Sequence, residues 1–551
     1  MQWVQNYYTV GNSVFLTALC SALPILFLFW ALGIKKMKGY LAIMFAWFLT
    51  LLTAIIVHRM PLTAALSAAA YGAIQGIFPL CWLAFHALLF YNLIVKSGNF
   101  ETIKFSISSI SNDRRIQAVL IGFIFSAFLE GTTGPGAAMG ISAAMLTALG
   151  FPALTAITLS LIGNSVPGSF GPAGMPVIVM VNSALSGVPG AFLAVAGSVG
   201  GVLSIFGLLV PVLMLIAMCG WKQAKEVFPF SIVTSLCYGI PNLFISRYLG
   251  PELPSILSPL AALAGIIVFL KFWKPRTIWR FEGDPGPGAE ETVYCSPGKI
   301  AYAWSPFILM VLVMVLWALP SFRAFSLSLP FTINISPWPG LHGIVYMAAP
   351  IVNESTVYAA SFRFDLFAAV GTALLFISFI TILIFRMRIS VFMKVYIATL
   401  KQISLALVTI ILVLSIAQLS NYSGISFTLG LAFAATGRLF VVFSPIIGFT
   451  GVFLTGSIAS SGALFGNLQR ISAEQLGLNP IITITANMAG SAMGKLISPQ
   501  SITIVAASIG LAGREGLILG KMLKYAFLLL GICIVILLIL AYVFPGYFPE
   551  L

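Results

Sequence analysis

Long apolar runs follow one another from end to end of the sequence, and short polar loops separate them. A helix that crosses a bilayer needs about 20 consecutive apolar residues, and many of these runs reach that length. The pattern predicts an all-α, polytopic membrane protein with about 12–14 hydrophobic segments. We expect the first span near residues 12–33, the second near 40–57, a third that bends at Pro79, and the last near 525–543.

Composition supports the same class. Of the 551 residues, 60% are hydrophobic and only 8% are charged, which is too little charge to cover the surface of a soluble protein. The formal net charge is +14, and the Lys and Arg residues lie in the short loops. This distribution is typical of cytoplasmic loops and argues against nucleic acid as a partner. We expect a multi-pass protein of the cell inner membrane with both termini in the periplasm.

The longest polar stretch divides the chain. Residues 274–299 contain RFEGDPGPGAEE, a composition typical of a flexible linker, and its basic flanks predict a cytoplasmic position. The chain then consists of a first membrane half, residues 1–273, and a second membrane half, residues 300–551. The mixed, aromatic stretch 321–363 is expected to lie outside, along the membrane interface.

Four apolar stretches are interrupted by Gly, Pro, Ser and Thr, and they lie near residues 129–149, 164–176, 455–465 and 487–499. Backbone that breaks at membrane depth is tolerated only where it is buried in protein or lines a wet cavity. We therefore expect re-entrant, cavity-lining segments. Close packing of helices through small residues is the alternative.

The broken stretches also occur in pairs. FLEG begins at Phe128 and FLTG at Phe453, and each precedes a run of small residues. Asn164 and Asn487 each follow a similar turn sequence, with Gly seven and Pro twelve positions later. The basic loops predict that the FLEG helix runs outward and the FLTG helix inward. Opposed directions of one motif indicate two inverted-topology repeats, which bind solute near the midplane.

Several motifs resemble the lactate permease family, in order and over nearly the whole chain: FLEGTTGPGAAMGISAAML, NESTVYAASFRFDLFAAVGTA, SNYSG, GVFLTGSIASSGALF and NMAGSAMGKLISPQSI. The resemblance implies a secondary transporter that moves L-lactate, D-lactate or glycolate with protons across the bacterial inner membrane. It implies a small monocarboxylate and protons as partners, no cofactor and no metal. A homo-oligomer is left open.

The sequence departs from the family pattern at two places. Ile458 stands where the resemblance leads us to expect Asp, and Gly462 stands where it leads us to expect Asn. The first-half motif reads EGTTGPG where the family resembles EGAAGFG. The loss of an intramembrane carboxylate bears on coupling, so an uncoupled channel or an exchanger for another small anion is the alternative function.

Two carboxylates are expected to carry the proton. Glu130 lies at the end of an apolar helix, where an ionisable group costs about 2.5–3.5 kcal/mol on insertion scales. Burial favours the neutral form of a carboxyl group, which suits a proton carrier. A carboxylate that caps the following helix is the structural alternative. Glu354, in APIVNESTVYAA, is the second acid.

Substrate contacts are expected from the broken segments. Asn164 and Asn487 carry amides that can both donate to a carboxylate and accept from a hydroxyl, as a 2-hydroxy acid requires. Lys495 can add a full positive charge, although it can also reach out to the interface. Hydrogen bonding between helices is the alternative for the polar residues. The remaining expected substrate-binding residues are Gly131, Thr132, Gly134, Thr455, Ser457, Ser460 and Ser461.

Other function classes fit less well. A channel would favour repeated pore motifs in a symmetric oligomer, whereas this chain holds two predicted inverted halves. An enzyme would need a metal or nucleophile constellation, and the three histidines form no HExxH motif, nor does a GxSxG motif occur. The sequence therefore predicts a transporter and no enzymatic activity.

Overall fold

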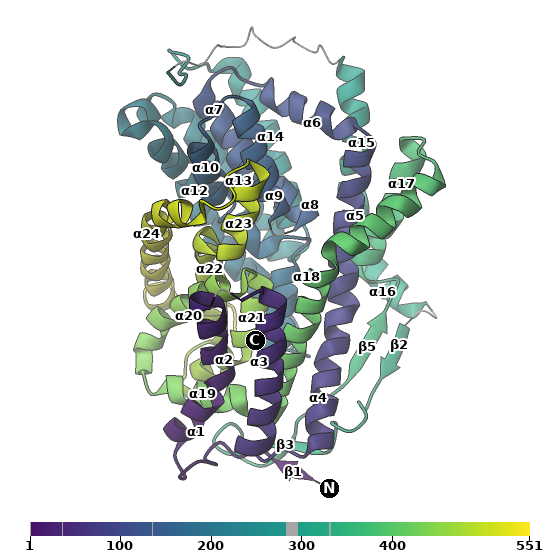
Figure 1. Ribbon diagram of the computed structural model, residues 1–551, viewed down its shortest axis with the longest axis vertical. Helices are drawn as coiled ribbons and strands as arrows, with labels where there is room; N and C mark the ends of the chain where they lie inside the picture. The colour runs from purple at the N-terminus through teal and green to yellow at the C-terminus, as the bar shows by residue number, and fades with distance from the viewer. Residues whose placement is uncertain (1, 36, 135, 283–295, 330–331, 551) are drawn as a thin grey trace.

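The computed structural model describes residues 2–35, 37–134, 136–282, 296–329 and 332–550, and it is almost entirely helical (Figure 1). In this described part, 11 helices are long and apolar enough to cross a membrane, and shorter apolar helices accompany them. The all-α membrane fold predicted from the apolar runs is confirmed. The central part of the predicted linker, residues 283–295, lies outside the described residues.

Each of the first three spans combines α-helix with a short π-helical segment, labelled η. They are α1 (Val14–Ser21), α2 (Leu23–Leu28) and η1 (Phe29–Ile34); α3 (Gly39–Leu52) and η2 (Thr53–Val57); and α4 (Leu62–Gln75), η3 (Gly76–Cys81) and α5 (Trp82–Lys96). The third span bends at Phe78, which has φ −134° and ψ 130°. The bend follows from Pro79, because proline lacks an N–H and disfavours helical backbone in the residue before it.

The next elements form the centre of the molecule. They are α6 (Asn99–Ser108), α7 (Arg114–Val119), η4 (Leu120–Phe125), α8 (Ser126–Thr133), α9 (Ala137–Ala148), α10 (Ala153–Gly163), η5 (Pro167–Phe170) and α11 (Met175–Ala184). In the span Arg114–Thr133 all residues of the most apolar 18-residue stretch are buried, whereas in the first span only 33% of the corresponding stretch is buried. Protein, rather than lipid, therefore surrounds this helix.

Long peripheral helices enclose this centre. They are α12 (Ala191–Glu226), α13 (Phe228–Tyr248), α14 (Pro254–Phe272), α15 (Pro297–Ala318), α16 (Pro320–Ser328), α17 (Val370–Ile384) and α18 (Ile389–Ser423). Helix α12 changes direction at Gly220, where φ is 77° and ψ is 169°. Because residues other than glycine rarely adopt this backbone conformation, the turn depends on Gly220.

Short strands occur near the start of the chain and in and just after the stretch predicted to lie outside. They are β1 (Trp3–Val4), β2 (Thr332–Ile335), β3 (Val345–Met347), β4 (Thr356–Val357) and β5 (Phe362–Asp365). β1 pairs in parallel with β3, and β2 pairs antiparallel with β5. Figure 1 places β1 and β3 at the lower end of the molecule, opposite the end where α14 leads toward α15. The start of the chain and the end of α14 therefore lie at opposite ends.

The second half closes with a second set of broken helices. They are α19 (Ile425–Ala434), η6 (Gly437–Leu439), α20 (Phe440–Thr455), α21 (Ile458–Gln475), α22 (Pro480–Gly494), η7 (Lys495–Ile497), α23 (Pro499–Ser508), α24 (Glu515–Tyr542) and η8 (Pro545–Tyr547). Helix α8 ends at Gly134 (φ 83°) and α20 at Gly456 (φ 72°). Residues 487–494 are helical, and the interruption begins at Lys495. The inverted relation between the halves stays a prediction.

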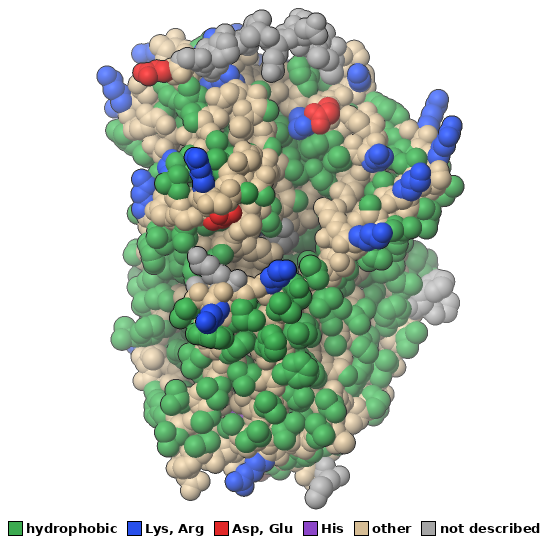
Figure 2. Space-filling view, viewed as in Figure 1, with side chains coloured by type: hydrophobic (Ala, Val, Ile, Leu, Met, Phe, Trp, Pro, Cys, Tyr) green, Lys and Arg blue, Asp and Glu red, His purple; other side chains and the backbone are tan. Residues whose placement is uncertain are grey.

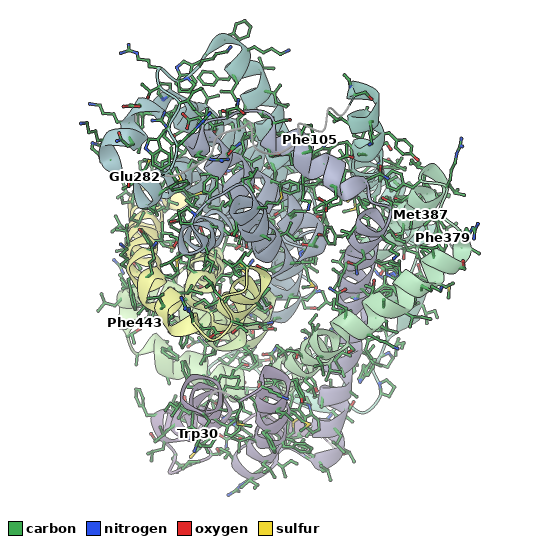
Figure 3. All side chains as sticks on the ribbon, turned by 45° about the horizontal axis from the view of Figure 1, so that its top comes forward. Trp30, Phe105, Glu282, Phe379, Met387 and Phe443 are labelled. Carbon is green, nitrogen blue, oxygen red and sulfur yellow. The ribbon has the colours of Figure 1, made fainter. Side chains whose placement is uncertain are left out.

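The surface is divided between apolar and basic regions. Figure 2 shows apolar side chains over the lower part of the visible face, whereas Lys and Arg gather over the upper part and around α17. Trp30, Phe379 and Phe443, labelled in Figure 3, are exposed by 44%, 42% and 40%. Large apolar side chains left exposed in this way indicate a lipid-facing belt.

Candidate functional site

An ion pair between the two halves of the chain lies at the centre of the candidate site. The Nζ atom of Lys495 donates to Oε1 of Glu130 at 2.6 Å and to Oδ1 of Asn164 at 2.7 Å. The amide nitrogen of Asn164 in turn donates to Oγ of Ser126 at 3.1 Å. The structure thus joins three of the residues expected from the sequence: Glu130, Asn164 and Lys495.

These groups are almost completely removed from solvent. Glu130 is 1% exposed, Lys495 2% and Asn164 0%. Glu and Lys are rarely buried to this degree unless they are paired, because an isolated buried ion costs several kcal/mol. The pair has no net charge, yet Oε2 of Glu130 has no hydrogen-bond partner among the described residues. One carboxylate oxygen is therefore available for a proton or a ligand.

The end of α8 is fixed by its own residues. The N–H of Gly134 donates to the carbonyl of Glu130 at 3.2 Å, and the hydroxyl of Thr132 donates to the carbonyl of Leu129 at 3.1 Å. A Cβ on Gly131 would lie 2.7 Å from the carbonyl oxygen of Ser255, so this glycine allows α14 to approach. Gly131, Thr132 and Gly134 therefore position Glu130.

Two glycines of the segment after α10 lie directly against the ion pair. A Cβ on Gly171 would stand 2.6 Å from Cγ of Glu130, and a Cβ on Gly168 would stand 3.2 Å from Nζ of Lys495. A side-chain carbon would not fit at Gly171 and would be tight at Gly168, so backbone rather than side chains forms this wall of the site. Neither glycine is among the expected substrate-binding residues, although Gly171 is the glycine seven positions after Asn164 and both lie in the broken stretch 164–176, where glycine indicates close approach.

Lys495 follows a helix that is held very close to its neighbour. It is the residue that ends α22, and η7 and α23 continue from it. A Cβ on Gly490 would collide with the carbonyl oxygen of Pro445, so α22 and α20 touch through their backbones. This contact fixes the end of α22, and with it the position from which Lys495 reaches Glu130.

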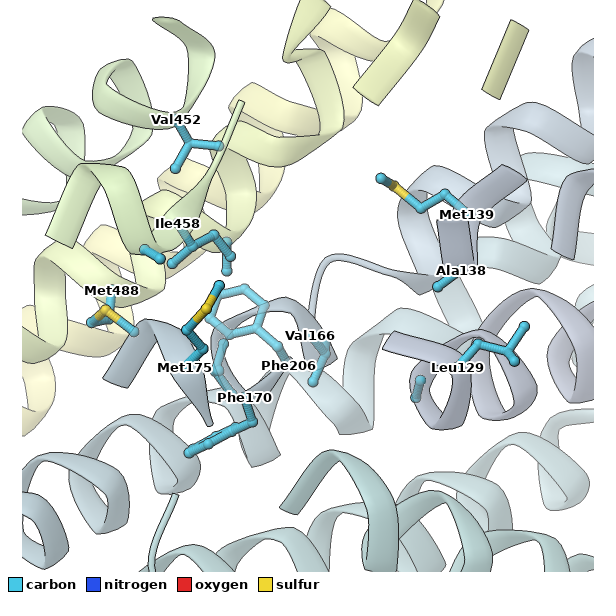
Figure 4. Close-up of a cluster of buried hydrophobic side chains, with 14 of the residues drawn as sticks. Leu129, Ala138, Met139, Val166, Phe170, Met175, Phe206, Val452, Ile458 and Met488 are labelled. Atoms are coloured by element: carbon cyan, nitrogen blue, oxygen red, sulfur yellow. The ribbon is translucent and has the colours of Figure 1, made fainter. Parts of the chain in front are cut away.

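An apolar side chain of the second half lies close to the pair. Figure 4 labels this residue, Ile458 of α21, in a buried hydrophobic cluster that includes Met175 and Phe170 of the first half. The Cδ1 atom of Ile458 would lie 3.0 Å from a Cβ on Gly168, the same point that Nζ of Lys495 approaches. Ile458 therefore presents an apolar wall beside the ammonium group, at the position where the family resemblance leads us to expect a carboxylate.

Asn487 is buried in a different way from Asn164. It lies within α22 and has no exposed surface, and neither its amide nitrogen nor its amide oxygen has a hydrogen-bond partner among the described residues. A buried amide without partners costs about 1–3 kcal/mol. Such a group is a candidate for a ligand contact, although the structure does not join it to the ion pair.

The hydroxyl residues of the second half serve the local backbone. Oγ of Ser457 accepts the N–H of Ser460 at 3.3 Å and so caps α21. The hydroxyl of Thr455 donates to the carbonyl of Gly451 at 2.8 Å, and that of Ser461 donates to the carbonyl of Gly448 at 3.3 Å. The Ser461 bond joins α21 to α20, whereas the Thr455 and Ser457 bonds are local to α20 and to the start of α21, so these three hydroxyls have structural partners. The Ser460 contact involves its backbone N–H, so it does not decide the role of the Ser460 hydroxyl.

The second expected acid lies elsewhere. Glu354 is exposed, two residues before β4, and it takes no part in the hydrogen bonds of the buried pair. Nearby, Arg363 and Asp365 form an ion pair at 3.3 Å. Glu130 is therefore the carboxylate that the structure brings to the centre of the site.

A second buried ion pair lies away from this site. Arg115 is fully buried, and its guanidinium donates to Asp113 at 2.7 Å and to Glu226 at 2.9 Å. It also donates to the carbonyl of Thr277 at 2.7 Å. These bonds tie the start of α7 to the end of α12 and to the segment after α14, which indicates a structural role.

No group of three or more His, Cys, Asp or Glu within the described ranges is placed to hold a metal ion. The pairing of Glu130 with Lys495 was not among the expectations from the sequence, which gave the two residues separate roles. The available signal was that opposite charges occur in two apolar, broken segments, where an unpaired ion would be costly.

Comparisons with known proteins agree over nearly the full chain. A family model described as L-lactate permease matches residues 17–544. The chain is 39% identical to the L-lactate permease of Escherichia coli (strain K12), covering 99% of this chain and 100% of that protein. It is 37% identical to the L-lactate permease of Bacillus subtilis (strain 168), with 97% and 98% covered. It is also 37% identical to the glycolate permease GlcA of Escherichia coli (strain K12), with 99% of each covered.

Among solved structures, the YdaH transporter of Alcanivorax borkumensis matches with a TM-score of 0.42 and 16% sequence identity. The match covers 85% of this chain and 86% of that one. A TM-score of 0.42 is too low for this similarity to assign a fold or a function to this chain.

Proposed function

Because the chain belongs to the L-lactate permease family, we propose that it transports L-lactate or a related 2-hydroxy monocarboxylate, such as D-lactate or glycolate, across the inner membrane by proton symport. Relatives of comparable identity are named for L-lactate and for glycolate. These two acids share a carboxylate and a 2-hydroxyl group, so the proposed substrate class is defined by that pair of groups.

The observation that carries the proposal is the buried pair of Glu130 and Lys495. Ionisable groups inside a membrane protein are costly, and they mark the paths of substrates and protons. A carboxyl group can take up and release a proton, and an ammonium group attracts a carboxylate. Both lie beside helix interruptions, at Gly134 and at η7, where transporters bind their solutes.

The proposed orientation follows from the charges. Lys and Arg gather toward the end of the molecule where α14 leads to α15, and β1 lies at the other end (Figures 1 and 2). Cytoplasmic loops carry an excess of Lys and Arg, so we place the 274–299 region in the cytoplasm and the N-terminus in the periplasm. The basic stretch 514–524 precedes the expected last span, so we propose a periplasmic C-terminus as well.

Uptake into proteoliposomes tests this function. The purified protein should accumulate labelled L-lactate when the outside is more acidic than the inside, and a protonophore should abolish the accumulation. Glycolate should compete with lactate, whereas propionate, which lacks the hydroxyl group, should compete at least tenfold less well, a difference of about 1.4 kcal/mol.

Two results would contradict the proposal. Saturable uptake that does not depend on the proton gradient would indicate an exchanger. This is the alternative function that follows from Ile458 in place of a carboxylate. Flux that does not saturate and does not depend on the gradient would indicate a channel.

A further inference from the structure

The contacts of Lys495 leave room for an exchange of partners. An ammonium group has three N–H donors, and the structure uses two of them, toward Glu130 at 2.6 Å and Asn164 at 2.7 Å. On one side lie the backbones of Gly168 and Gly171, and on another lies the apolar Ile458. Among these neighbours of Lys495, Glu130 is the carboxylate that a small anion would have to replace.

Resting on the proposed function, we infer that the substrate carboxylate replaces Glu130 as the partner of Lys495 and that Glu130 takes up the proton this replacement requires. The carboxylate of the substrate then accepts from Nζ of Lys495. The proton binds to a carboxylate oxygen of Glu130, where Oε2 already lacks a partner. Asn164 keeps the ammonium in place while its partner changes.

Charge balance makes the two events depend on each other. The empty pair is neutral. Binding of the anion alone would leave one uncompensated negative charge, and binding of the proton alone would leave one uncompensated positive charge. Either state costs several kcal/mol in a site that is only 1–2% exposed. Only the empty pair and the site loaded with both are neutral, so one proton accompanies each monocarboxylate.

Other ionisable groups near α8 do not replace Glu130 in this scheme. The elements that pack on α8 include η4, α9, α10, η5, α14 and α5. Of these, α5 carries His86, Tyr91 and Lys96, and α14 carries Lys271. His86 uses its Nδ1 atom with the carbonyl of Trp82, at 2.8 Å. In the described part of the chain, the salt bridge of Glu130 is with Lys495.

The test is the pH dependence of lactate affinity in the purified, full-length protein. In the unchanged protein, lactate binding should weaken about tenfold per pH unit over the range in which one proton is taken up per anion. In Glu130→Gln the amide mimics the protonated acid and leaves Lys495 free. Lactate should bind to this variant with an affinity that changes less than twofold per pH unit, and calorimetry in two buffers should show no proton uptake.

Stability measurements keep the test decisive if Glu130→Gln folds poorly. Its unpaired ammonium should be compensated by lactate, so saturating lactate should raise its melting temperature more than that of the unchanged protein. The double variant Glu130→Gln, Lys495→Met removes both charges and should fold but bind lactate at least tenfold more weakly. Lys495→Arg, which keeps the charge, should bind better than Lys495→Gln.

The outcomes separate the two proposals. If the unchanged protein binds and transports no 2-hydroxy monocarboxylate, the proposed function fails. If it does so with protons, but Glu130→Gln retains the same pH dependence and proton uptake, the function stands and the exchange of partners is wrong. Unchanged lactate affinity in Lys495→Gln would also overturn the inference.

Discussion

The carboxylate of Glu130 and the ammonium of Lys495 meet at 2.6 Å although 365 positions separate them in the chain. Each lies at the end of a helix, one in each membrane half. The contact therefore depends on the packing of the two halves, and any movement that separates them must either break the pair or supply another partner. A substrate carboxylate and a proton are the partners that keep both side chains neutralised.

Replacing Ile458 by Asp would add a second carboxylate beside Lys495. Because Ile458 Cδ1 and Lys495 Nζ approach the same point next to Gly168, the new group should share the ammonium. The empty site would then be neutral only with one proton already bound, and loading with lactate would take up one further proton. The dependence of lactate affinity on pH should therefore stay about tenfold per unit, whereas lactate affinity itself should fall because two carboxylates compete for the ammonium. Ile458→Asn is the uncharged control, and equal lactate affinity of the two variants would contradict the expectation.

Gly171→Ala should damage the site through sterics alone. The added Cβ would lie 2.6 Å from Cγ of Glu130 and 2.6 Å from its carbonyl oxygen. Overpacking of this kind costs about 1–3 kcal/mol, so both the melting temperature and lactate uptake should fall. In the control Gly520→Ala, on α24, the Cβ meets nothing within 4 Å, and stability should hold or rise. Normal uptake by Gly171→Ala would show that the wall is not tight.

The two asparagines should respond differently to substitution by leucine. Asn487 has no partners for its amide, so Asn487→Leu should keep or raise the melting temperature while weakening lactate binding. Asn164→Leu removes the bonds to Lys495 and Ser126 and should lower the melting temperature. Thermal unfolding and lactate titration of both variants check this. If Asn487→Leu binds lactate normally, Asn487 is not a substrate contact.

Arg115→Ala should destabilise the protein without a specific effect on lactate affinity. It leaves Asp113 buried without its cation, a change that costs about 3–5 kcal/mol. The melting temperature should fall, and the surviving folded protein should bind lactate as before. The exposed Arg276 provides the control substitution, Arg276→Ala, which should leave the melting temperature unchanged. A large loss of lactate affinity in folded Arg115→Ala would contradict a purely structural role.

The proposed orientation can be tested by labelling in whole cells. In a variant without native cysteines, Gln2→Cys should react with an impermeant thiol reagent from the periplasmic side, and Lys274→Cys should not. Both positions are exposed, so accessibility depends only on the side of the membrane. Labelling of Lys274→Cys alone would reverse the orientation and the predicted directions of the repeats.

Features that depend on neighbouring residues could be predicted from the sequence. The membrane spans follow from apolar runs of sufficient length, and the bend before Pro79 follows from the chemistry of proline. Gly134 and Gly456 end their helices with positive φ, inside stretches selected for their small residues. Glu130, Asn164 and Lys495 could be selected because polar groups are rare and costly in apolar segments.

The tertiary structure alone decided which of these groups meet. It joined Lys495 to Glu130 and Asn164, left Asn487 without partners, and placed Glu354 in the exposed β4 region. The sequence by itself determined where the chain crosses the membrane and where its helices break, because those properties are local. Partners 365 residues apart are set by how closely helices pack, and backbone contacts such as that of Gly490 with Pro445 exist only in the folded chain.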